Sequence, residues 1–528
     1  MALNLADLFE AVVDVVPDRD AIVCGDERVT FAELDRAANR FGHWLVEAGV
    51  RPGEHVAIHL RNGIEYVQCV LGALKARAVP ININYRYTSD ELAYLYDNSE
   101  SVVVVVGADF LPAALEARDR APGVRSVLTV GAEGSDAAAS VHPFETQVAH
   151  CAGEREFGQR SEDDHFVVYT GGTTGLPKGV VWRHEDFYFA ALGGGSFTGP
   201  PLRDEGALAD AVAGSTFAMS YLVTAPLMHG AALYSLFAGF FSGSLQVLMP
   251  TFEPVEALRL VEAERIGCVM VVGDAIAGPL ADAIDEHHDH FDLSSLFMVG
   301  SGGALWSDAV RTRLRRHLPQ LYLRDGFGAS ESGVDGVLET GEDGRPRIEA
   351  SEAMLLVDEE HRPIPPGSSE VGLLARTGHV PLGYHNDPVR SAETFPTIDG
   401  RRSAVLGDMA HWDGEDRFVV LGRGSVCIDT GGEKVFVEEV EAALKGHPAV
   451  FDAVVAGAPD DRYGERVCAV IALRDPAAVI DEAELTEHCR GGLAGYKVPR
   501  SFVVVPEIVR SPSGKADYRW ARATVAES

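Results

Sequence analysis

Residues 169–180 read YTGGTTGLPKGV, a segment rich in glycine and threonine that ends in a lysine, a glycine and an apolar residue. Glycines let a backbone approach an anion with its N–H groups turned inward. Threonine hydroxyls add donors or a metal ligand, and Lys178 adds a positive charge that suits phosphate. Residues 165–168, just upstream, have the apolar composition of a strand. The segment therefore predicts a polyphosphate-binding loop at the end of a strand.

This loop differs from the two most common nucleotide-binding sequences. A Walker A motif needs a glycine directly before the lysine, but Pro177 occupies that position and Gly179 follows the lysine instead. The glycine spacing of a dinucleotide-binding fingerprint is also missing. A flexible surface linker rarely runs from such a segment straight into apolar residues, so the sequence favours a phosphate loop of another type.

Further short segments combine glycine with charged, hydroxyl or aromatic side chains, and each is weak evidence alone. In chain order they are PLMHG at 226–230, GSGGA at 300–304, DGFGASE at 325–331, GD at 407–408, GRGS at 422–425, GG at 431–432 and SPSGK at 511–515. Glycines beside the aromatic ring of DGFGASE suit a stacked base, and its terminal carboxylate suits Mg²⁺. A carboxylate such as Asp408 can accept both hydroxyls of a ribose.

With these motifs in this order, the chain resembles the adenylate-forming enzymes, which include acyl-CoA synthetases, luciferases and peptide-synthetase adenylation domains. The resemblance covers nearly the whole chain. It is closest to the long-chain and steroid side-chain acyl-CoA synthetases of actinobacteria, because the loop is accompanied by WRHED at 182–186 and GRGS at 422–425.

The resemblance implies a binding site for ATP, Mg²⁺ and CoA. The implied nucleotide-binding residues are Thr170, Gly171, Gly172, Thr173, Thr174, Gly175, Lys178, Gly302, Gly303, Ala304, Asp325, Gly326, Phe327, Gly328, Ser330, Glu331, Asp408, Arg423 and Lys515. Thr173 and Glu331 would coordinate Mg²⁺, Phe327 would pack on adenine, and Asp408 with Arg423 would hold the ribose. Tyrosine and threonine are usual in the family where Phe327 and Ser330 stand here.

The resemblance also implies a reaction in two steps. A carboxylate first attacks the α-phosphorus of ATP, with Lys178, Glu331, Thr173 and Lys515 as catalytic residues. A C-terminal domain then rotates about Ser425, where relatives carry Asp or Lys, and the CoA thiol attacks the acyl adenylate. Gly431 and Gly432 would line the pantetheine tunnel, since a thin thiol chain needs positions without side chains. The acyl pocket would include His229, Gly230, Gly302 and Gly328.

Composition indicates a multidomain globular protein of a reducing compartment. The chain has 528 residues, and 46% of them are hydrophobic. We expect a cytoplasmic protein, because there is no apolar run of the ~18 residues that span a membrane, no signal peptide and no paired cysteine motif. The net charge of −34 argues against nucleic acid as a partner and requires local positive charge wherever ATP and CoA bind. A homodimer is compatible with the resemblance.

The order of predicted elements indicates an α/β fold with parallel-rich sheets flanked by helices. Thr30 and Glu33 form a capping box before a helix, five valines at 102–106 predict a buried strand, and residues 269–272 and 297–299 predict two more. Residues 333–420 predict a small β-rich subdomain. We expect an N-terminal adenylation domain at 1–421, a hinge at 422–426 and a mobile α+β domain at 427–528, with helices near 437–446 and 483–490 and strands near 452–456, 467–473 and 501–505.

The resemblance favours a hydrophobic acid, either a long-chain fatty acid or a steroid side-chain acid, and the sequence leaves an aromatic or medium-chain acid open. Two other activities are open as well. The enzyme could pass its acyl adenylate to a carrier protein, or the chain could be a catalytically lapsed nucleotide-binding module. Oxidation of the luciferase type is a weaker alternative.

Overall fold

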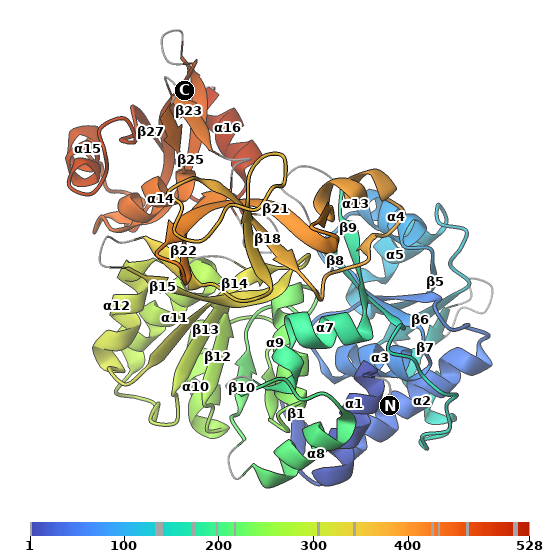
Figure 1. Cartoon of the computed structure of the whole chain (residues 1–528). Helices are drawn as coiled ribbons and strands as arrows, with labels where there is room; N and C mark the ends of the chain where they lie inside the picture. Colours follow the sequence, from blue (N-terminus) through green and yellow to red (C-terminus); the bar gives the residue numbers. More distant parts are fainter. Residues whose placement is uncertain are drawn as a thin grey trace.

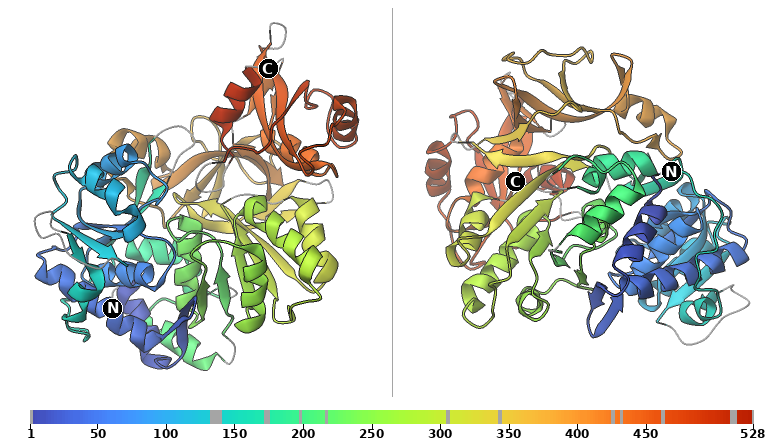
Figure 2. Two further views of the ribbon diagram at one scale, coloured as in Figure 1. Left: turned by 180° about the vertical axis from the view of Figure 1, so that it is seen from behind. Right: turned by 60° about the horizontal axis from the view of Figure 1, so that its bottom comes forward.

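The computed structural model describes residues 3–131, 141–170, 176–196, 199–215, 218–303, 307–341, 345–423, 427–430, 433–460, 464–510 and 516–526. Within these residues the strands form three sheets of 14, 8 and 5 strands (Figure 1). The first two belong to the large N-terminal part, and the third belongs to a smaller C-terminal part that packs at one end of the molecule, as Figure 2 also shows. The predicted α/β fold class is therefore confirmed.

The first sheet has a parallel half and an antiparallel half. The parallel strands are β1 (Asp20–Cys24), β10 (Tyr221–Val223), β11 (Gln246–Leu248), β12 (Cys268–Val271), β13 (Met298–Gly302) and β14 (Tyr322–Ala329), with β2 (Glu27–Thr30) antiparallel at the edge. Helices α10 (Pro254–Ala263), α11 (Gly273–His287) and α12 (Asp308–His317) cover one face of this half. Crossover helices of this kind are what parallel neighbours require.

The predicted β-rich subdomain exists, but it continues the first sheet instead of forming one of its own. Its strands are β15 (Gly333–Thr340), β16 (Pro346–Glu349), β17 (Met354–Val357), β18 (Gly372–Thr377), β20 (Thr397–Ile398), β21 (Arg401–Asp413) and β22 (Arg417–Arg423). They are joined antiparallel through the pairing of β14 with β15. The nucleotide motif at 325–331 therefore lies where the parallel half meets the antiparallel half.

The second sheet has the order β19-β9-β8-β4-β3-β5-β6-β7. Its strands are β3 (His55–His59), β4 (Val79–Asn82), β5 (Ser101–Gly107), β6 (Ser126–Val130), β7 (Val141–Pro143), β8 (His165–Thr170), β9 (Lys178–Arg183) and β19 (Gly383–Tyr384). Helices α4 (Ser89–Asn98) and α5 (Leu111–Arg118) cover its outer face.

The largest hydrophobic core lies between these two sheets, because it contains residues of both, such as Ile22 and Val223 from the first and Val56 and Phe166 from the second. The helices that contribute to it are α1 (Leu5–Val15), α2 (Phe31–Glu47), α3 (Ile64–Lys75), α6 (Phe144–Ala149), α7 (His184–Ala191), α8 (Glu205–Gly214) and α9 (Gly230–Phe240). The α2 helix begins with the predicted capping box, in which Thr30 and Glu33 satisfy each other's backbone N–H groups.

The C-terminal part is an α+β unit, as expected. Its strands are β23 (Ile428–Thr430), β24 (Glu433–Val435), β25 (Val450–Asp460), β26 (Gly464–Leu473) and β27 (Ser501–Val504), and its helices are α14 (Val437–Lys445), α15 (Glu482–Arg490) and α16 (Tyr518–Ala526). Helices α14 and α15 pack on one face of the sheet and α16 on the other. Among the described helices, none is long and apolar enough to cross a membrane.

Candidate active site

The predicted phosphate loop is the turn of a β-hairpin. Strands β8 and β9 pair antiparallel, with Thr170 opposite Lys178, so the hairpin fixes both ends of the loop. Residues 171–175, which include the predicted Gly171, Gly172, Thr173, Thr174 and Gly175, lie outside the described residues. The expected strand before the loop is confirmed as β8.

One buried side chain holds the start of this loop in place. Asn82, at the end of β4, donates to the Tyr169 carbonyl at 2.9 Å and accepts from the Tyr169 N–H at 2.7 Å. The same Asn82 amide donates to the Met228 carbonyl, directly before His229. One side chain therefore ties the phosphate loop to the segment that carries the predicted acyl-pocket residues His229 and Gly230.

The structure brings Lys178 and Glu331 together around Tyr384. The Tyr384 hydroxyl donates to Glu331 Oε1 at 2.9 Å, and Lys178 Nζ lies 5.1 Å from the centroid of the Tyr384 ring. Burial lowers the pKa of Lys178, and nearby Arg390 lowers it further, while Glu331 opposes the shift. Burial and the charge of Glu331 raise the pKa of Tyr384, so this phenol is a neutral donor at physiological pH.

Glu331 lies in the tight turn between β14 and β15. Trp182 Nε1 donates to the carbonyl of Ser330 at 3.0 Å, and the Tyr234 hydroxyl also points to this carbonyl at 3.5 Å. A Cβ at Gly328 would lie 2.1 Å from the Gly333 carbonyl oxygen, so only glycine fits there. These contacts fix the direction in which the Glu331 carboxylate leaves the turn.

The WRHED segment at 182–186 contacts the protein groups that surround the Glu331 turn. Trp182 is fully buried and holds the Ser330 carbonyl, as described above. His184 is 1% exposed, and its Nδ1 accepts from the Leu5 N–H at 3.3 Å, which ties α7 to the first helix. Asp186 pairs with His379 at 2.7 Å. The described contacts of the segment are therefore with protein groups of the scaffold around the Glu331 turn.

The predicted adenine motif is part of a strand instead of a loop after one. Strand β14 runs through Phe327 to Ala329, and Phe327 lies opposite Gly336 of β15. Phe327 is partly buried and packs against the core of the antiparallel half. Ser330 Oγ lies 3.2 Å from the position that a Cβ at Gly230 would take, so the second motif meets the acyl-pocket segment.

Asp325, the first residue of this motif, is bound to protein and not open to solvent. It is 2% exposed and forms an ion pair with Arg311 of α12. Burial raises the pKa of Asp325 to about 7, against the opposing charge of Arg311. Gly326 lies opposite Gly302 in the pairing of β13 with β14, and Gly303 follows β13 directly. Ala304 lies outside the described residues.

The two residues assigned to the ribose are brought together. Asp408 of β21 lies directly opposite Arg423 of β22 in the antiparallel register. Fourteen residues separate them in sequence, because β21 and β22 form a long hairpin. Their separation in the sequence is therefore that of a cross-strand pair.

The predicted residues of the hinge and of the C-terminal domain lie outside the described residues. These are Ser425 of the hinge, Gly431, Gly432 and Lys515. The flanking residues show where they belong: strands β23 and β24 pair antiparallel on either side of Gly431 and Gly432. Arg510 and Ala516 form a bridge on either side of the Lys515 segment.

Among the described residues, an ion pair between Lys445 and Asp274 joins the C-terminal part to the N-terminal part. Lys445, at the end of α14, lies 3.6 Å from Asp274 in the first turn of α11 and 3.4 Å from Asp452 of β25. Asp452 in turn receives two bonds of 2.7 Å from Arg510, the last described residue before the Lys515 segment. These ionic contacts link α14 and β25 of the C-terminal part to α11 of the N-terminal part.

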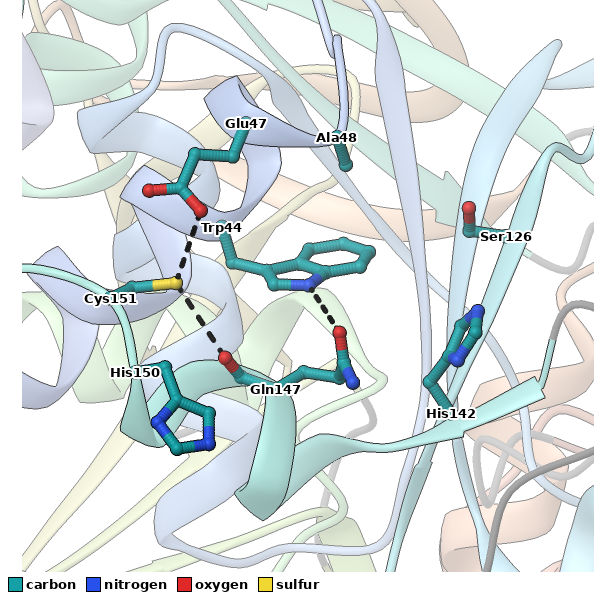
Figure 3. Close-up of a pocket in the computed structure, with 8 residues that line it drawn as sticks. All are labelled: Trp44, Glu47, Ala48, Ser126, His142, Gln147, His150 and Cys151. Atoms are coloured by element: carbon teal, nitrogen blue, oxygen red, sulfur yellow. Dashed lines mark hydrogen bonds between the residues drawn. The ribbon is translucent and has the colours of Figure 1, made fainter. Parts of the chain in front are cut away.

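A separate surface pocket of about 370 Å³ lies away from these motifs, between α2, α6 and the edge of the second sheet (Figure 3). Its floor is Trp44, whose indole N–H donates to Gln147 at 3.3 Å, and the Cys151 thiol donates to Glu47 at 3.8 Å. It shares no residue with the predicted site.

Tyr384 and Asn82 are the two site residues that sequence reasoning missed. Tyr384 lies in a strand of only two residues, and Asn82 is a single polar residue at the end of an apolar strand. The usable signal for Tyr384 was its position after Gly383 and before Asp387-Pro388, a helix start.

The fold and the order of the motifs indicate an enzyme that binds a nucleotide. The AMP-binding enzyme family matches residues 9–385, and the AMP-binding enzyme C-terminal domain matches residues 439–515. The chain belongs to this family, and the predicted resemblance is confirmed.

Relatives of known name cover the full length of the chain. The medium/long-chain-fatty-acid–CoA/3-oxocholest-4-en-26-oate–CoA ligase of Mycobacterium marinum is 43% identical over 99% of this chain and 96% of its own. The 3-oxocholest-4-en-26-oate–CoA ligase of Rhodococcus rhodochrous is 42% identical over the same shares. The crystal structure of the anthranilate CoA ligase AuaEII with anthranoyl-AMP matches with a TM-score of 0.84 at 24% identity, over 100% of this chain and 98% of that one. That likeness supports the fold.

Proposed function

We propose that this chain is an AMP-forming acid–CoA ligase, which joins a hydrophobic carboxylic acid to CoA through an acyl adenylate. The carrying observation is the meeting of Lys178 and Glu331 around Tyr384 at the mouth of the hairpin loop. A cation for phosphate and a carboxylate for Mg²⁺ are there side by side. The family membership and the named ligase relatives support the same reaction.

The residues present suit the cofactors. Mg²⁺ in phosphate-transfer sites is commonly bound by one or two carboxylates together with substrate phosphates, and Glu331 is such a carboxylate. The ion would neutralise the phosphates of ATP as pyrophosphate leaves. Thr173 is proposed as its second ligand. Lys178 attracts the same phosphates, and the hydrogen bond from Tyr384 keeps the Glu331 carboxylate aimed at them.

The remaining nucleotide contacts follow the strands. Phe327 offers its ring to adenine at the junction of β14 and β15, and the ribose is held by Asp408 and Arg423 across the β21–β22 pair. We propose domain boundaries at 1–421 and 427–528 with a hinge at 422–426. Lys515 would act in adenylation, and Gly431 with Gly432 would pass the pantetheine chain after rotation about Ser425.

The acid is proposed to be a long-chain fatty acid or a steroid side-chain acid, as in the names of the relatives. The acyl side lies along α9, where His229 and Gly230 open the helix and mainly apolar residues follow. Seven free cysteines and the net charge of −34 support a cytoplasmic enzyme without a nucleic-acid partner. A homodimer stays a prediction, which sedimentation would check.

The test is a pair of assays on the purified chain with ATP, Mg²⁺ and a panel of fatty, aromatic and steroid acids. We expect acid-dependent release of pyrophosphate and, with free CoA, stoichiometric acyl-CoA. Pyrophosphate release without acyl-CoA would instead indicate transfer to a carrier protein. Absence of both with every acid would leave a nucleotide-binding module and contradict the proposal.

A further inference from the structure

We propose that Arg324 selects the substrate by binding a second oxygen-bearing group of the acid, in addition to the carboxylate that reacts. This inference rests on the proposed function, because it concerns the acyl side of the same site. Arg324 lies on β14, three residues before Phe327 and one before the buried Asp325. Neither the motifs nor the composition of the chain assigns it a role.

Strand register places Arg324 on the acyl face of the first sheet. Successive residues along each strand point alternately to the two faces of the sheet. One set of neighbours packs into the core beneath α10, α11 and α12; it comprises Leu222, Val269 and Val299. The adjacent positions therefore face the opposite side, and they form a row across β10, β12, β13 and β14 that consists of Val223, Met270, Gly300 and Arg324.

The guanidinium lies beside Gly326, a predicted nucleotide residue that pairs with the predicted acyl-pocket residue Gly302. Its Nη1 atom is 3.7 Å from the position that a Cβ at Gly326 would take. Gly326 lies opposite Gly302, and a Cβ at Gly302 would lie 3.8 Å from the Cβ of Ala231 on α9. Arg324 therefore projects into the space between the sheet and α9, the same side as the acyl-pocket segment 226–230.

Arg324 has no counter-ion in the part of the chain that the structure describes. It makes no ion pair and no hydrogen bond there, although it is only partly exposed. The next arginines of this domain behave differently, since Arg311 pairs with Asp325 and Arg376 pairs with Asp335 at 2.9 Å. In a chain with 79 acidic and 45 basic residues, a partly buried arginine without a carboxylate is unusual.

The polar groups near Arg324 do not supply the missing anion. Its charge opposes the effect of burial on Cys268 and Tyr221, which places both groups within its electrostatic reach. Burial nevertheless raises the pKa of Cys268 to about 12 and raises the pKa of Tyr221 as well, so both are neutral at physiological pH. The positive charge on this face is left for a ligand.

The ligand class follows from the chemistry of guanidinium. A planar fork of N–H donors binds a carboxylate or a carbonyl oxygen, whereas a plain hydrocarbon chain laid over it would bury an unpaired charge. Arg324 and Gly326 are two residues apart on β14, a separation of about 7 Å along the strand. If the reacting carboxylate lies beside Gly326, the second group of the acid lies within several bonds of it. We therefore assign the site to oxo acids or dicarboxylic acids, two sources of the same acceptor chemistry.

The experiment compares matched acids on the full-length enzyme. Acid-dependent kcat/KM is measured for an unsubstituted fatty acid, for oxo acids of the same length with the keto group moved along the chain, and for dicarboxylic acids of the same length. We expect one position of the keto group or second carboxylate to raise kcat/KM by roughly 10- to 100-fold over the plain acid, the range of a hydrogen bond to a charged group. The preferred series shows which of the two sources is correct.

Variants then localise the effect. Arg324→Met is expected to abolish this preference and to raise activity on the plain acid, with the KM for ATP unchanged; Arg324→Lys keeps part of it. Arg316→Met, an exposed arginine on α12, is the control and keeps the full preference. The inference is overturned if the wild type prefers the plain acid at every position, a result that needs no variant to fold, or if Arg324→Met keeps the preference. Failure of the proposed function looks different, because no acid would then be activated.

Discussion

Two lysines of this molecule show how a folded scaffold differs from a binding site. Lys75, in α3, is fully buried and lies between Glu10 and Asp35, the latter at 2.7 Å. Lys178, at the mouth of the hairpin loop, has no carboxylate at ion-pair distance within the described residues, and its ammonium faces the Tyr384 ring. In the core, Lys75 is paired with two carboxylates, whereas in the site Lys178 keeps a positive charge that a phosphate can pair with.

The largest expected effect follows from removal of the buried Lys75 side chain, which is paired with two carboxylates. Lys75→Met would leave Glu10 and Asp35 buried without their shared cation, so the free energy of unfolding should fall by about 3–5 kcal/mol. Urea titration followed by tryptophan fluorescence measures it. Arg51→Met removes an exposed pair with Glu54 and serves as the control, with an expected loss of about 1 kcal/mol or less. Similar losses of unfolding free energy in the two variants would contradict the proposed difference between a buried and an exposed ion pair.

Lys178→Met should show the opposite pattern. Removal of a charge that acts on the phosphates should lower acid-dependent pyrophosphate release by roughly 10²–10³-fold, the range found for a lost electrostatic contact in a catalytic site. The melting temperature should change little, because no protein carboxylate loses its partner. Lys497→Met, which breaks the pair with Glu439 in the C-terminal part, is a matched lysine control for activity. A large fall in stability without loss of rate would show that Lys178 is structural.

Tyr384→Phe sharpens the comparison within the site. The variant keeps the ring that faces Lys178 but loses the hydroxyl that donates to Glu331. We expect a roughly tenfold rise in the Mg²⁺ concentration that gives half-maximal rate, since a hydrogen bond to a charged group is lost. Tyr496→Phe, at an exposed tyrosine, is the control. An unchanged Mg²⁺ dependence would separate Tyr384 from metal binding.

The smallest effect concerns two buried carboxylates and pH. Burial would raise the pKa of Glu10, but Lys75 and Arg160 outweigh it, so the pKa is lowered. At Glu441 of α14 burial outweighs the opposing charges and raises the pKa to about 8. Glu441 therefore keeps its proton in the folded state, and its contribution to stability is complete below about pH 4.5 and is lost as the pH rises to about 8.

Glu441→Gln tests this sign directly. The variant should show a flatter dependence of the urea midpoint on pH between about 4.5 and 8 than the wild type, because the amide does not titrate. Glu482→Gln, at an exposed glutamate of α15, should keep the wild-type slope. A wild-type slope in Glu441→Gln would assign the pH dependence to another group.

Local patterns predicted several elements of this fold. The capping box at Thr30 and Glu33, the valine run in β5 and the strand before the phosphate loop each depend on neighbouring residues, so the sequence contained enough information. The continuation of β14 through Phe327 was not predicted, because glycines weaken a strand pattern and only the pairing with β15 stabilises it.

Site residues that lie within a recognisable motif were predictable from the sequence, whereas residues that the fold brings in from distant segments were not. Glu331 and Lys178 stood within recognisable motifs. Tyr384 joins them from a two-residue strand more than 50 residues beyond Glu331. Its local signal, the position between Gly383 and the helix start at Asp387-Pro388, marks a turn and not the contact with Glu331. Arg324 was missed for a similar reason, since its lack of a carboxylate is a property of the folded surroundings.

The way the chain shares its strands between the two large sheets limits how the protein can come apart. Strands β1 and β2, from the first thirty residues, complete the first sheet, while β19, from residues 383–384, completes the second. A break anywhere between these points would leave each piece missing an edge that the other one holds. Split or truncated versions of this region should therefore fold only when both fragments are present, and β19 joins the phosphate-loop hairpin only after synthesis has passed residue 384.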